Sequence, residues 1–310
     1  MHIVAFVPKT AVPEQGSGGL SAARVGALLP DRVHIFDFAS ALDLGSTLPP
    51  WSAWYDLDSE WLPKAMKLAA VLDASRASQR PGSLVPLADV RLVAPVPRPG
   101  KIICIGLNYR DHAEESKMAV PESPITFSKY ATCVTGPAAP VYLPRTSEKV
   151  DYEAELAVVI GRRAKHVPVA RAFHHVLGYT NFNDVSARDF QFADGQWQRG
   201  KSCDSFAPMG PAIVTTDEIP DPHRLSLRLR LNGETMQSST TGQLIFGVDR
   251  LIAFISETVT LEPGDVIATG TPPGVGFARK PPVFLKPGDL MEVEVEGLGV
   301  LSNPVLADPA

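Results

Sequence analysis

DYEAELAVVIG, residues 151–161, places three acidic side chains at alternate positions before an apolar run. Successive side chains of a β-strand point to opposite faces, so Asp151, Glu153 and Glu155 would share one face. Carboxylates at such short separation repel one another, and water, a basic side chain or a metal ion could each offset the repulsion. The stretch predicts a β-strand that begins with an acidic face.

A second alternating stretch, MEVEVEG at 291–297, shows that this pattern alone does not identify a site. Glu292, Glu294 and Glu296 share a face there, and we interpret them as the solvated side of a half-buried strand. Periodicity alone would give residues 151–155 the same interpretation. A functional interpretation of Glu153 and Glu155 therefore rests on the residues that accompany them.

The composition limits the class of protein. The 310 residues are enough for one large domain, or for a large domain with a small one. The chain is 45% hydrophobic and 20% charged, as in soluble globular proteins, and its apolar runs are too short to span a membrane. A net charge of −5 without a basic block argues against nucleic acid as a partner. A small-molecule ligand is the remaining expectation.

Cysteine usage points to a reduced, cytoplasmic setting. Cys104, Cys133 and Cys203 show no C-x-x-C spacing, which argues against a disulfide framework and against a thiolate zinc site. The amino-terminal MHIVAFVP predicts a strand and lacks the basic and long apolar regions of a signal peptide.

Turn residues divide the chain into short elements. The 29 prolines and 24 glycines separate short alternating or apolar runs, which predicts a mainly β fold with some α (α+β). The Pro-rich VAPVPRPGK at 93–101 predicts a linker between a small amino-terminal domain, 1–95, and a catalytic domain, 99–308. Helices are expected over 60–74 and 111–120. LEPGDVIATG (261–270) and LKPGDLMEVEV (285–295) each predict a turn that leads into a strand.

A third carboxylate follows an apolar stretch in NDVSARDF, residues 183–190. Hard divalent cations prefer carboxylate oxygens, and Mg²⁺ usually keeps several waters. Glu153 and Glu155, with Asp184 from elsewhere, would supply three ligands and leave positions open for water and substrate. No His or Cys lies at a spacing that favours zinc. The sequence thus suggests an oxygen-rich metal site.

Four further stretches carry candidate chemistry, and the first two also have an ordinary interpretation. His112 and Glu115, neighbours on a helical turn, could form a general base, or belong to a charged surface helix. Lys201 in GKSCDSF could stabilise a substrate carboxylate or an enolate, or be solvated. TGTPPGVG at 269–276 could bind an anion through backbone amides and Thr271. QFADGQWQRG at 191–200 could be a mobile loop over the site that touches substrate through Trp197 or Gln198.

Taken together, these stretches resemble the fumarylacetoacetate hydrolase family over about residues 99–305. The matching phrases occur in the order of that family: GLNYRDHAEE, SPITFSKY, VDYEAELAVVIGR, NDVSARDFQ, GKSCDSFAPMGP, LIFGVDRLIAFIS and LEPGDVIATGTPPGVG. The resemblance implies a mixed β-sandwich roll, usually in a homodimer, that binds Mg²⁺, or Mn²⁺ or Ca²⁺.

The resemblance also implies a role for each matching residue. It makes Glu153, Glu155 and Asp184 the metal ligands, and it leaves Asp151 outside that set, as a neighbouring or structural residue. The remaining implied roles are catalytic for His112, Glu115 and Lys201, and substrate-binding for Arg188, Gln191, Lys201 and Thr271.

The activity that the resemblance favours is metal-dependent hydrolysis of a carbon–carbon bond. The substrate would be a 2-oxo acid or 1,3-dicarbonyl compound of the acylpyruvate or fumarylpyruvate kind, with water activated by the His–Glu dyad. The same site could instead decarboxylate oxaloacetate-like acids, or isomerise 2-hydroxy-dienedioates of homoprotocatechuate-type aromatic catabolism. A non-catalytic metal- or ligand-binding protein is the alternative of a different class.

Overall fold

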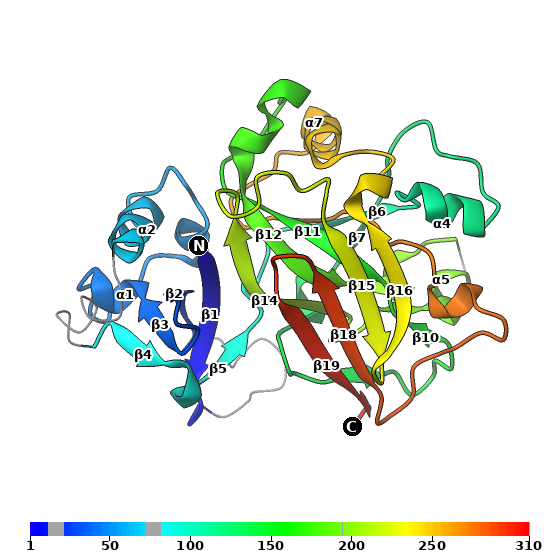
Figure 1. The fold of residues 1–310 in the computed structure, drawn as a ribbon, viewed down its shortest axis with the longest axis horizontal. Coiled ribbons are helices and arrows are strands. Elements are labelled where there is room, and N and C mark those ends of the chain that lie inside the picture. The colour runs from blue at the N-terminus through cyan, green and yellow to red at the C-terminus, as the bar shows by residue number, and fades with distance from the viewer. Residues whose placement is uncertain (12–21, 72–81, 194, 310) are drawn as a thin grey trace.

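A twelve-stranded mixed sheet runs through the computed structural model, which describes residues 1–11, 22–71, 82–193 and 195–309 (Figure 1). Its main path, in spatial order, is β4 (Leu84–Pro86), β3 (His34–Asp37), β2 (Arg24–Leu28), β1 (His2–Pro8), β14 (Ala207–Thr215), β12 (Val176–Asn183), β11 (Ala154–Ile160), β17 (Val266–Ala268), β6 (Ile102–Gly106) and β7 (Ile125–Lys129). Strand β5 (Val90–Val93) also pairs with β1, and β8 (Val134–Thr135) pairs with β14. The mainly β class predicted from the turn pattern is confirmed.

A five-stranded sheet packs against the centre of the large one. Its order is β16 (Glu234–Thr240), β15 (Ser226–Leu231), β18 (Leu290–Val295), β19 (Val300–Ala307) and β9 (Val141–Leu143), and β18 and β19 contact β12 (Figure 1). The buried Asn181 of β12 links the layers, because its Oδ1 accepts from Val295 N at 2.7 Å and its Nδ2 donates to the Gly299 carbonyl at 3.2 Å. β10 (Val150–Asp151) and β13 (Ser186–Ala187) form a separate pair.

Short helices cover the sheets. They are α1 (Phe38–Ala41), α2 (Leu62–Ala70), α4 (Arg110–Glu115), α5 (Arg188–Gln191), α6 (Gln198–Lys201) and α7 (Val248–Thr258), with 3₁₀ turns at Trp51–Trp54, Leu87–Asp89, Ala131–Cys133, Val169–His175, Thr241–Gln243 and Gly276–Ala278. α7 buries Val248, Leu251, Ile252 and Ile255, the spacing of one helical face. Both predicted helices are present in shorter form, and residues 72–74 of the first lie outside the described residues.

The two Pro-Gly-Asp turns form as predicted, and with the same hydrogen bonds. Asp265 Oδ2 accepts from Glu262 N, and Asp289 Oδ2 accepts from Lys286 N, both at 2.7 Å. The intervening glycines have φ of +86° and +97°, a region that side chains with a Cβ rarely adopt. These turns lead into β17 and β18, as the sequence predicts.

The amino-terminal part is joined more closely to the body than a linker suggests. Strand β1 pairs with β14, with His2 opposite Val214, so the large sheet is continuous across both parts. Within the Pro-rich stretch, Ala94 and Val96 are buried rather than solvated. The division into domains at 1–95 and 99–308 stays a prediction.

Two other expectations meet the structure here. Cys104 and Cys133 are buried, and burial raises the pKa of both thiols. A raised pKa disfavours the reactive thiolate, so both residues fit a packing role in the core better than a role as a catalytic thiol. No helix among the described residues is long and apolar enough to cross a membrane.

Candidate metal centre and its surroundings

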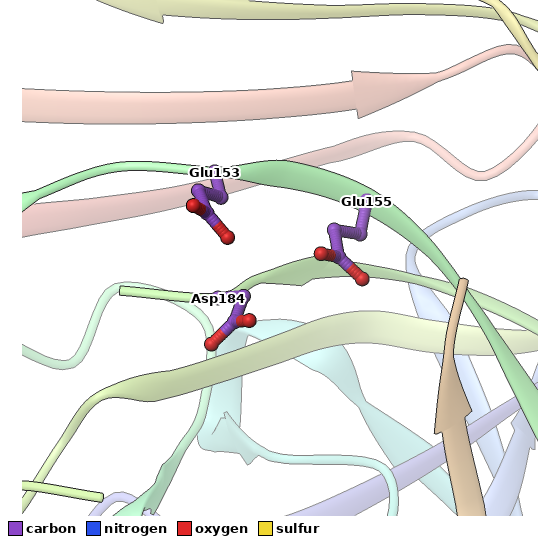
Figure 2. A group of neighbouring side chains, drawn as sticks. All are labelled: Glu153, Glu155 and Asp184. Carbon is purple, nitrogen blue, oxygen red and sulfur yellow. The ribbon is translucent and has the colours of Figure 1, made fainter. Parts of the chain in front are cut away.

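Three buried carboxylates meet at the junction of β11 and β12. One oxygen each from Glu153, Glu155 and Asp184 lies within 4.8 Å of the others, and Figure 2 shows the three groups turned toward one another. The antiparallel register places Ala154 opposite Asn183, and Asp184 N donates to the Glu153 carbonyl at 2.9 Å. Strand pairing therefore brings an acid that follows β12 beside the two acids at the start of β11.

The acidic stretch is not one continuous strand, and this corrects the expectation that three acids share a face. Asp151 belongs to β10, whereas Glu155 belongs to β11. Between them, Glu153 N donates to Asn183 Oδ1 at 2.9 Å and Ala154 N donates to Gln237 Oε1 at 2.8 Å. Side chains satisfy these amides in place of a neighbouring strand, and strand pairing is interrupted at residues 152 and 153. Asp151 therefore lies outside the carboxylate cluster, although Arg188 links it to Glu153.

Asp151 anchors the glycine-rich loop at 269–277. Its fully buried carboxylate accepts hydrogen bonds from Gly276 N at 2.7 Å and Phe277 N at 3.0 Å, and it pairs with Arg188 at 2.7 Å. A Cβ at Gly276 would lie 1.9 Å from the Val283 carbonyl oxygen, so only glycine fits beside Asp151. These contacts agree with the structural alternative given for Asp151.

Three buried cations surround the carboxylates. Lys201 Nζ donates to Glu153 Oε2 at 2.7 Å and to Asp184 Oδ2 at 2.8 Å. Arg188 Nη2 lies 2.6 Å from Glu153 Oε1, so it bridges Glu153 and Asp151. Lys129 Nζ donates to Asp184 Oδ1 at 2.6 Å, and its side chain is fully buried.

The role of Lys129 was not predicted from the sequence. It lies at the end of β7, within the quoted phrase SPITFSKY, and it shares strand parity with Ile125 and Phe127. A lysine at the inward end of an alternating strand is a weak signal, because most lysines remain solvated. Only the packing of β7 beside β6 brings it to Asp184.

With every group ionised, the centre would hold one more negative than positive charge. Asp151, Glu153, Glu155 and Asp184 face Lys129, Lys201 and Arg188, so four carboxylates meet three cations. The surplus falls on Glu155, which accepts a hydrogen bond from Gly270 N at 2.9 Å and has no ion pair among the described residues. Burial, together with Asp184 and Glu153, raises the pKa of Glu155 well above its usual value. Burial also opposes ionisation of Glu153, but Lys201 and Arg188 outweigh it and hold that pKa below the usual range.

This donor set fits a divalent cation. Carboxylate oxygens are the ligands that hard cations such as Mg²⁺ and Mn²⁺ prefer, and all three are buried. Glu155 lacks a positively charged partner, and a bound cation would supply one. Glu153, Glu155 and Asp184 are therefore the residues that could hold it.

The predicted His–Glu pair is formed at the end of α4. His112 Nδ1 and Glu115 Oε2 are 3.2 Å apart, and the Glu115 carboxylate also accepts from Gly274 N at 3.1 Å. The pair is partly solvated, with 15% of the His112 side chain and 33% of the Glu115 side chain exposed. α4 is held in place because Arg110 Nη1 donates to the Leu244 carbonyl at 2.7 Å. The dyad and Glu155 are thus both tied to the 269–277 loop.

Gln191 and Thr271 are committed to protein partners. Gln191 Oε1 accepts from Arg188 Nη1 at 2.9 Å, and both side chains are buried. Thr271 Oγ1 donates to the Ala154 carbonyl at 3.0 Å and accepts from Gln237 Nε2 at 2.9 Å. A direct contact of either side chain with substrate stays a prediction.

The expected loop at 191–200 is partly helical. Residues 198–201 form α6, whose first turn begins after Trp197, and residue 194 lies outside the described residues. α6 packs closely on α5, where a Cβ on Gly200 would lie only 2.5 Å from Gln191 N. This packing brings Lys201 to the carboxylates that follow β10 and β12.

Comparison with known proteins places this centre in a family. Residues 101–306 match the family described as Fumarylacetoacetate (FAA) hydrolase C-terminal. A mitochondrial oxaloacetate tautomerase of Bos taurus is 49% identical over 249 residues, which are 80% of this chain and 79% of that protein. A fumarylacetoacetate hydrolase domain-containing protein 2 homolog of Dictyostelium discoideum is 49% identical over 232 residues, which are 71% of this chain and 76% of that protein.

Solved structures agree along the whole chain. Fumarylacetoacetate hydrolase from Exiguobacterium antarcticum is 34% identical with a TM-score of 0.81, covering 99% of this chain and 100% of that one. 2-Hydroxyhepta-2,4-diene-1,7-dioate isomerase from Mycobacterium marinum is 32% identical with a TM-score of 0.74, covering 100% of both chains. These matches confirm the resemblance and the fold type that it implied. The chain belongs to the fumarylacetoacetate hydrolase family and is an enzyme of that family.

Proposed function

We propose that this protein is a divalent-cation-dependent enzyme that moves a proton within a 2-oxo dicarboxylate such as oxaloacetate, interconverting its enol and keto forms. The observation that carries the proposal is the buried cluster of Glu153, Glu155 and Asp184, in a chain 49% identical to an oxaloacetate tautomerase. This activity is close to the oxaloacetate alternative that the sequence left open. It differs from that alternative because no carbon–carbon bond breaks.

The charges around the cluster suit an anionic substrate. Four carboxylates and three cations leave one net negative charge, and a divalent cation would change it to one net positive charge. A buried site with surplus positive charge attracts a carboxylate, because few water molecules screen the interaction. Cation binding would therefore also prepare the site for a 2-oxo acid.

Glu153, Glu155 and Asp184 would hold the cation, here proposed to be Mg²⁺ or Mn²⁺, which would act as a Lewis acid toward the 2-oxo oxygen. Lys201, already at 2.7 Å from Glu153, would stabilise the negative charge of the enolate or of a substrate carboxylate. The remaining requirement is a group that carries a proton.

The His112–Glu115 pair meets that requirement. Glu115 binds His112 Nδ1, which leaves Nε2 of the same ring as the atom that accepts or donates the proton. In the keto direction the enol hydroxyl loses a proton and C3 gains one, so atoms and electrons balance without a co-reactant. Glu115 would orient the ring and stabilise its protonated form.

Hydrolysis of an acylpyruvate is the second candidate function. The same His112–Glu115 pair could deprotonate water, and the full length of the Exiguobacterium fumarylacetoacetate hydrolase is matched. A dienedioate isomerase would need the same proton carrier and resembles the Mycobacterium marinum protein. Decarboxylation of oxaloacetate would use the same enolate stabilisation.

Separate substrates distinguish these reactions. We would follow the ultraviolet absorbance of enol-oxaloacetate, pyruvate release from oxaloacetate and from acylpyruvates, and absorbance of a 2-hydroxy-dienedioate. Each assay is run with Mg²⁺, with Mn²⁺ and with EDTA, and with His112→Asn. Cation-dependent loss of the enol without pyruvate, abolished in the variant, supports the tautomerase. If the enzyme releases pyruvate from acylpyruvates while enol-oxaloacetate is lost only at its spontaneous rate, the protein is a hydrolase and the tautomerase proposal is wrong.

Two properties of the whole molecule are part of the proposal. We propose a homodimer, on family grounds, which light scattering after gel filtration would test. The cytoplasmic setting predicted from the cysteines also stays a proposal, since the Bos taurus relative is described as mitochondrial.

A further inference from the structure

Lys201 has an aromatic partner as well as its two carboxylates. Its Nζ lies 5.0 Å from the centroid of the Phe127 ring. A cation within about 6 Å of an aromatic face is attracted by the ring quadrupole. Two of the three ammonium protons can serve Glu153 and Asp184, and the ring provides a third, uncharged partner.

Lys129 provides a comparison within the same centre. Its Nζ is bonded to Asp184 Oδ1 at 2.6 Å and to the Val185 carbonyl at 3.0 Å. A carbonyl oxygen is a directional partner that fixes the ammonium, whereas a π face holds a cation without a fixed hydrogen-bond direction. Lys129 is therefore built as a fixed counter-charge, and Lys201 can reorient while keeping one partner.

The Phe127 ring is itself held in place. Trp197 meets it edge-on, with ring centroids 5.4 Å apart and planes at 68°. The indole packs closely on Gly106, where a Cβ would be only 2.8 Å from Trp197 Cζ3. The Trp197 carbonyl also accepts from Lys201 N at 3.1 Å. One residue thus fixes both the ring and the start of the helix that carries the lysine.

We propose that Phe127, backed by Trp197, is a positioning residue that keeps the Lys201 ammonium aimed at substrate when the carboxylates are occupied by a cation. The inference rests on the proposed function, because it assigns Lys201 a substrate oxygen. A divalent cation on Glu153 and Asp184 competes for the oxygens that Lys201 now binds. The ring is the partner that the cation does not take, so Lys201 stays inside the site.

Four variants separate this role from general packing. Phe127→Leu keeps apolar bulk and removes the π face, and Phe127→Tyr keeps the face. Gly106→Ala leaves every ring present and pushes Trp197 away from its place. Phe173→Leu removes another ring, 41% exposed and packed on His223, and serves as the control.

The first readout is independent of turnover. Protein labelled with ¹³Cε-lysine is examined by NMR with Mg²⁺ as the cation, because Mn²⁺ is paramagnetic and would broaden the signals. The Lys201 signal is assigned by its loss in Lys201→Arg. The ring above the ammonium should move this signal upfield. We expect the shift to vanish in Phe127→Leu, to shrink in Gly106→Ala, and to remain in Phe127→Tyr and Phe173→Leu.

The second readout is steady-state kinetics on the substrate identified above. We expect Phe127→Leu to lower kcat/KM roughly tenfold, mainly by raising KM, with Phe127→Tyr within about twofold of the parent. An unchanged Lys201 signal and unchanged KM in Phe127→Leu would overturn the inference. If the parent turns over no 2-oxo acid, the proposed function fails while the NMR comparison still decides whether Phe127 holds Lys201.

Discussion

Asn has nearly the same shape as Asp, yet replacing Asp151 by Asn should strongly destabilise the protein. The buried carboxylate receives N–H groups from Gly276 and Phe277 and pairs with Arg188 at 2.7 Å. The side-chain amide of Asn has one acceptor oxygen, so its nitrogen would face N–H donors that the carboxylate now accepts from. Arg188 would keep only Glu153 as a charged partner. Neutralising one member of a buried ion pair costs about 3–5 kcal/mol.

This cost converts into a measurable melting temperature. With an unfolding entropy of about 2.1 cal/mol/K per residue, a 310-residue chain should lose roughly 5–8 °C of Tm. Scanning calorimetry is run in EDTA, because a bound cation would add stability of its own.

A second Asp–Arg pair is the matched control. Asp58 is 66% exposed and lies 2.9 Å from Arg162. An exposed pair contributes under about 1 kcal/mol, so Asp58→Asn should lower Tm by less than roughly 2 °C. Equal shifts for Asp151→Asn and Asp58→Asn would refute the idea that the buried pair holds the 269–277 loop.

Three further predictions concern the metal, the proton carrier and pH. Glu155→Gln should weaken Mn²⁺ binding by more than about 100-fold in calorimetric titration, yet leave Tm in EDTA unchanged or higher, since it removes the surplus charge; a lower Tm would contradict the charge count. His112→Asn should keep Mn²⁺ affinity and lose about 100-fold or more of turnover; full turnover would remove His112 from the mechanism. Burial and Arg32 lower the pKa of His2 in the folded protein, despite Glu218. As the pH drops below 6.5, His2 is therefore protonated in the unfolded chain before it is protonated in the folded protein, and the stability of the folded protein falls. His2→Gln should flatten that part of the Tm–pH curve, and an unchanged slope would show that other groups set it.

The proposed ligand set was within reach of the sequence because its residues carry local signals. Two glutamates two residues apart and an aspartate in a family phrase were sufficient to name Glu153, Glu155 and Asp184, and the structure clusters them. The turn residues likewise predicted β17 and β18. In each case the deciding contacts lie within a few residues, or the family order supplied the long-range part.

What the sequence could not give depends on partners far along the chain. The break before β11 is made by Asn183 and Gln237, which are 30 and 83 residues away from the amides they bind. Lys129 reaches Asp184 across 55 residues, and only after β7 has paired with β6. Alternation describes where side chains would point in an unbroken strand, and it contains no information about such partners.

The two alternating acidic stretches therefore differ in what faces them. Glu292 and Glu294 of β18 lie opposite Arg230 and Arg228 of β15 and pair with them on a partly exposed face. Glu292 and Glu294 thus each have an arginine partner, and Glu296 accepts hydrogen bonds from Ser226 N and Oγ at 3.1 Å. In the described residues the buried carboxylates with an ion pair are Asp37, Asp151, Glu153, Asp184 and Asp265. Glu155 is the buried carboxylate there without one, and burial together with Asp184 and Glu153 raises its pKa well above the usual value. A buried carboxylate without a counter-charge, beside two other carboxylates, is the position that a divalent cation from solution would fill, and the cation would then favour its ionised form.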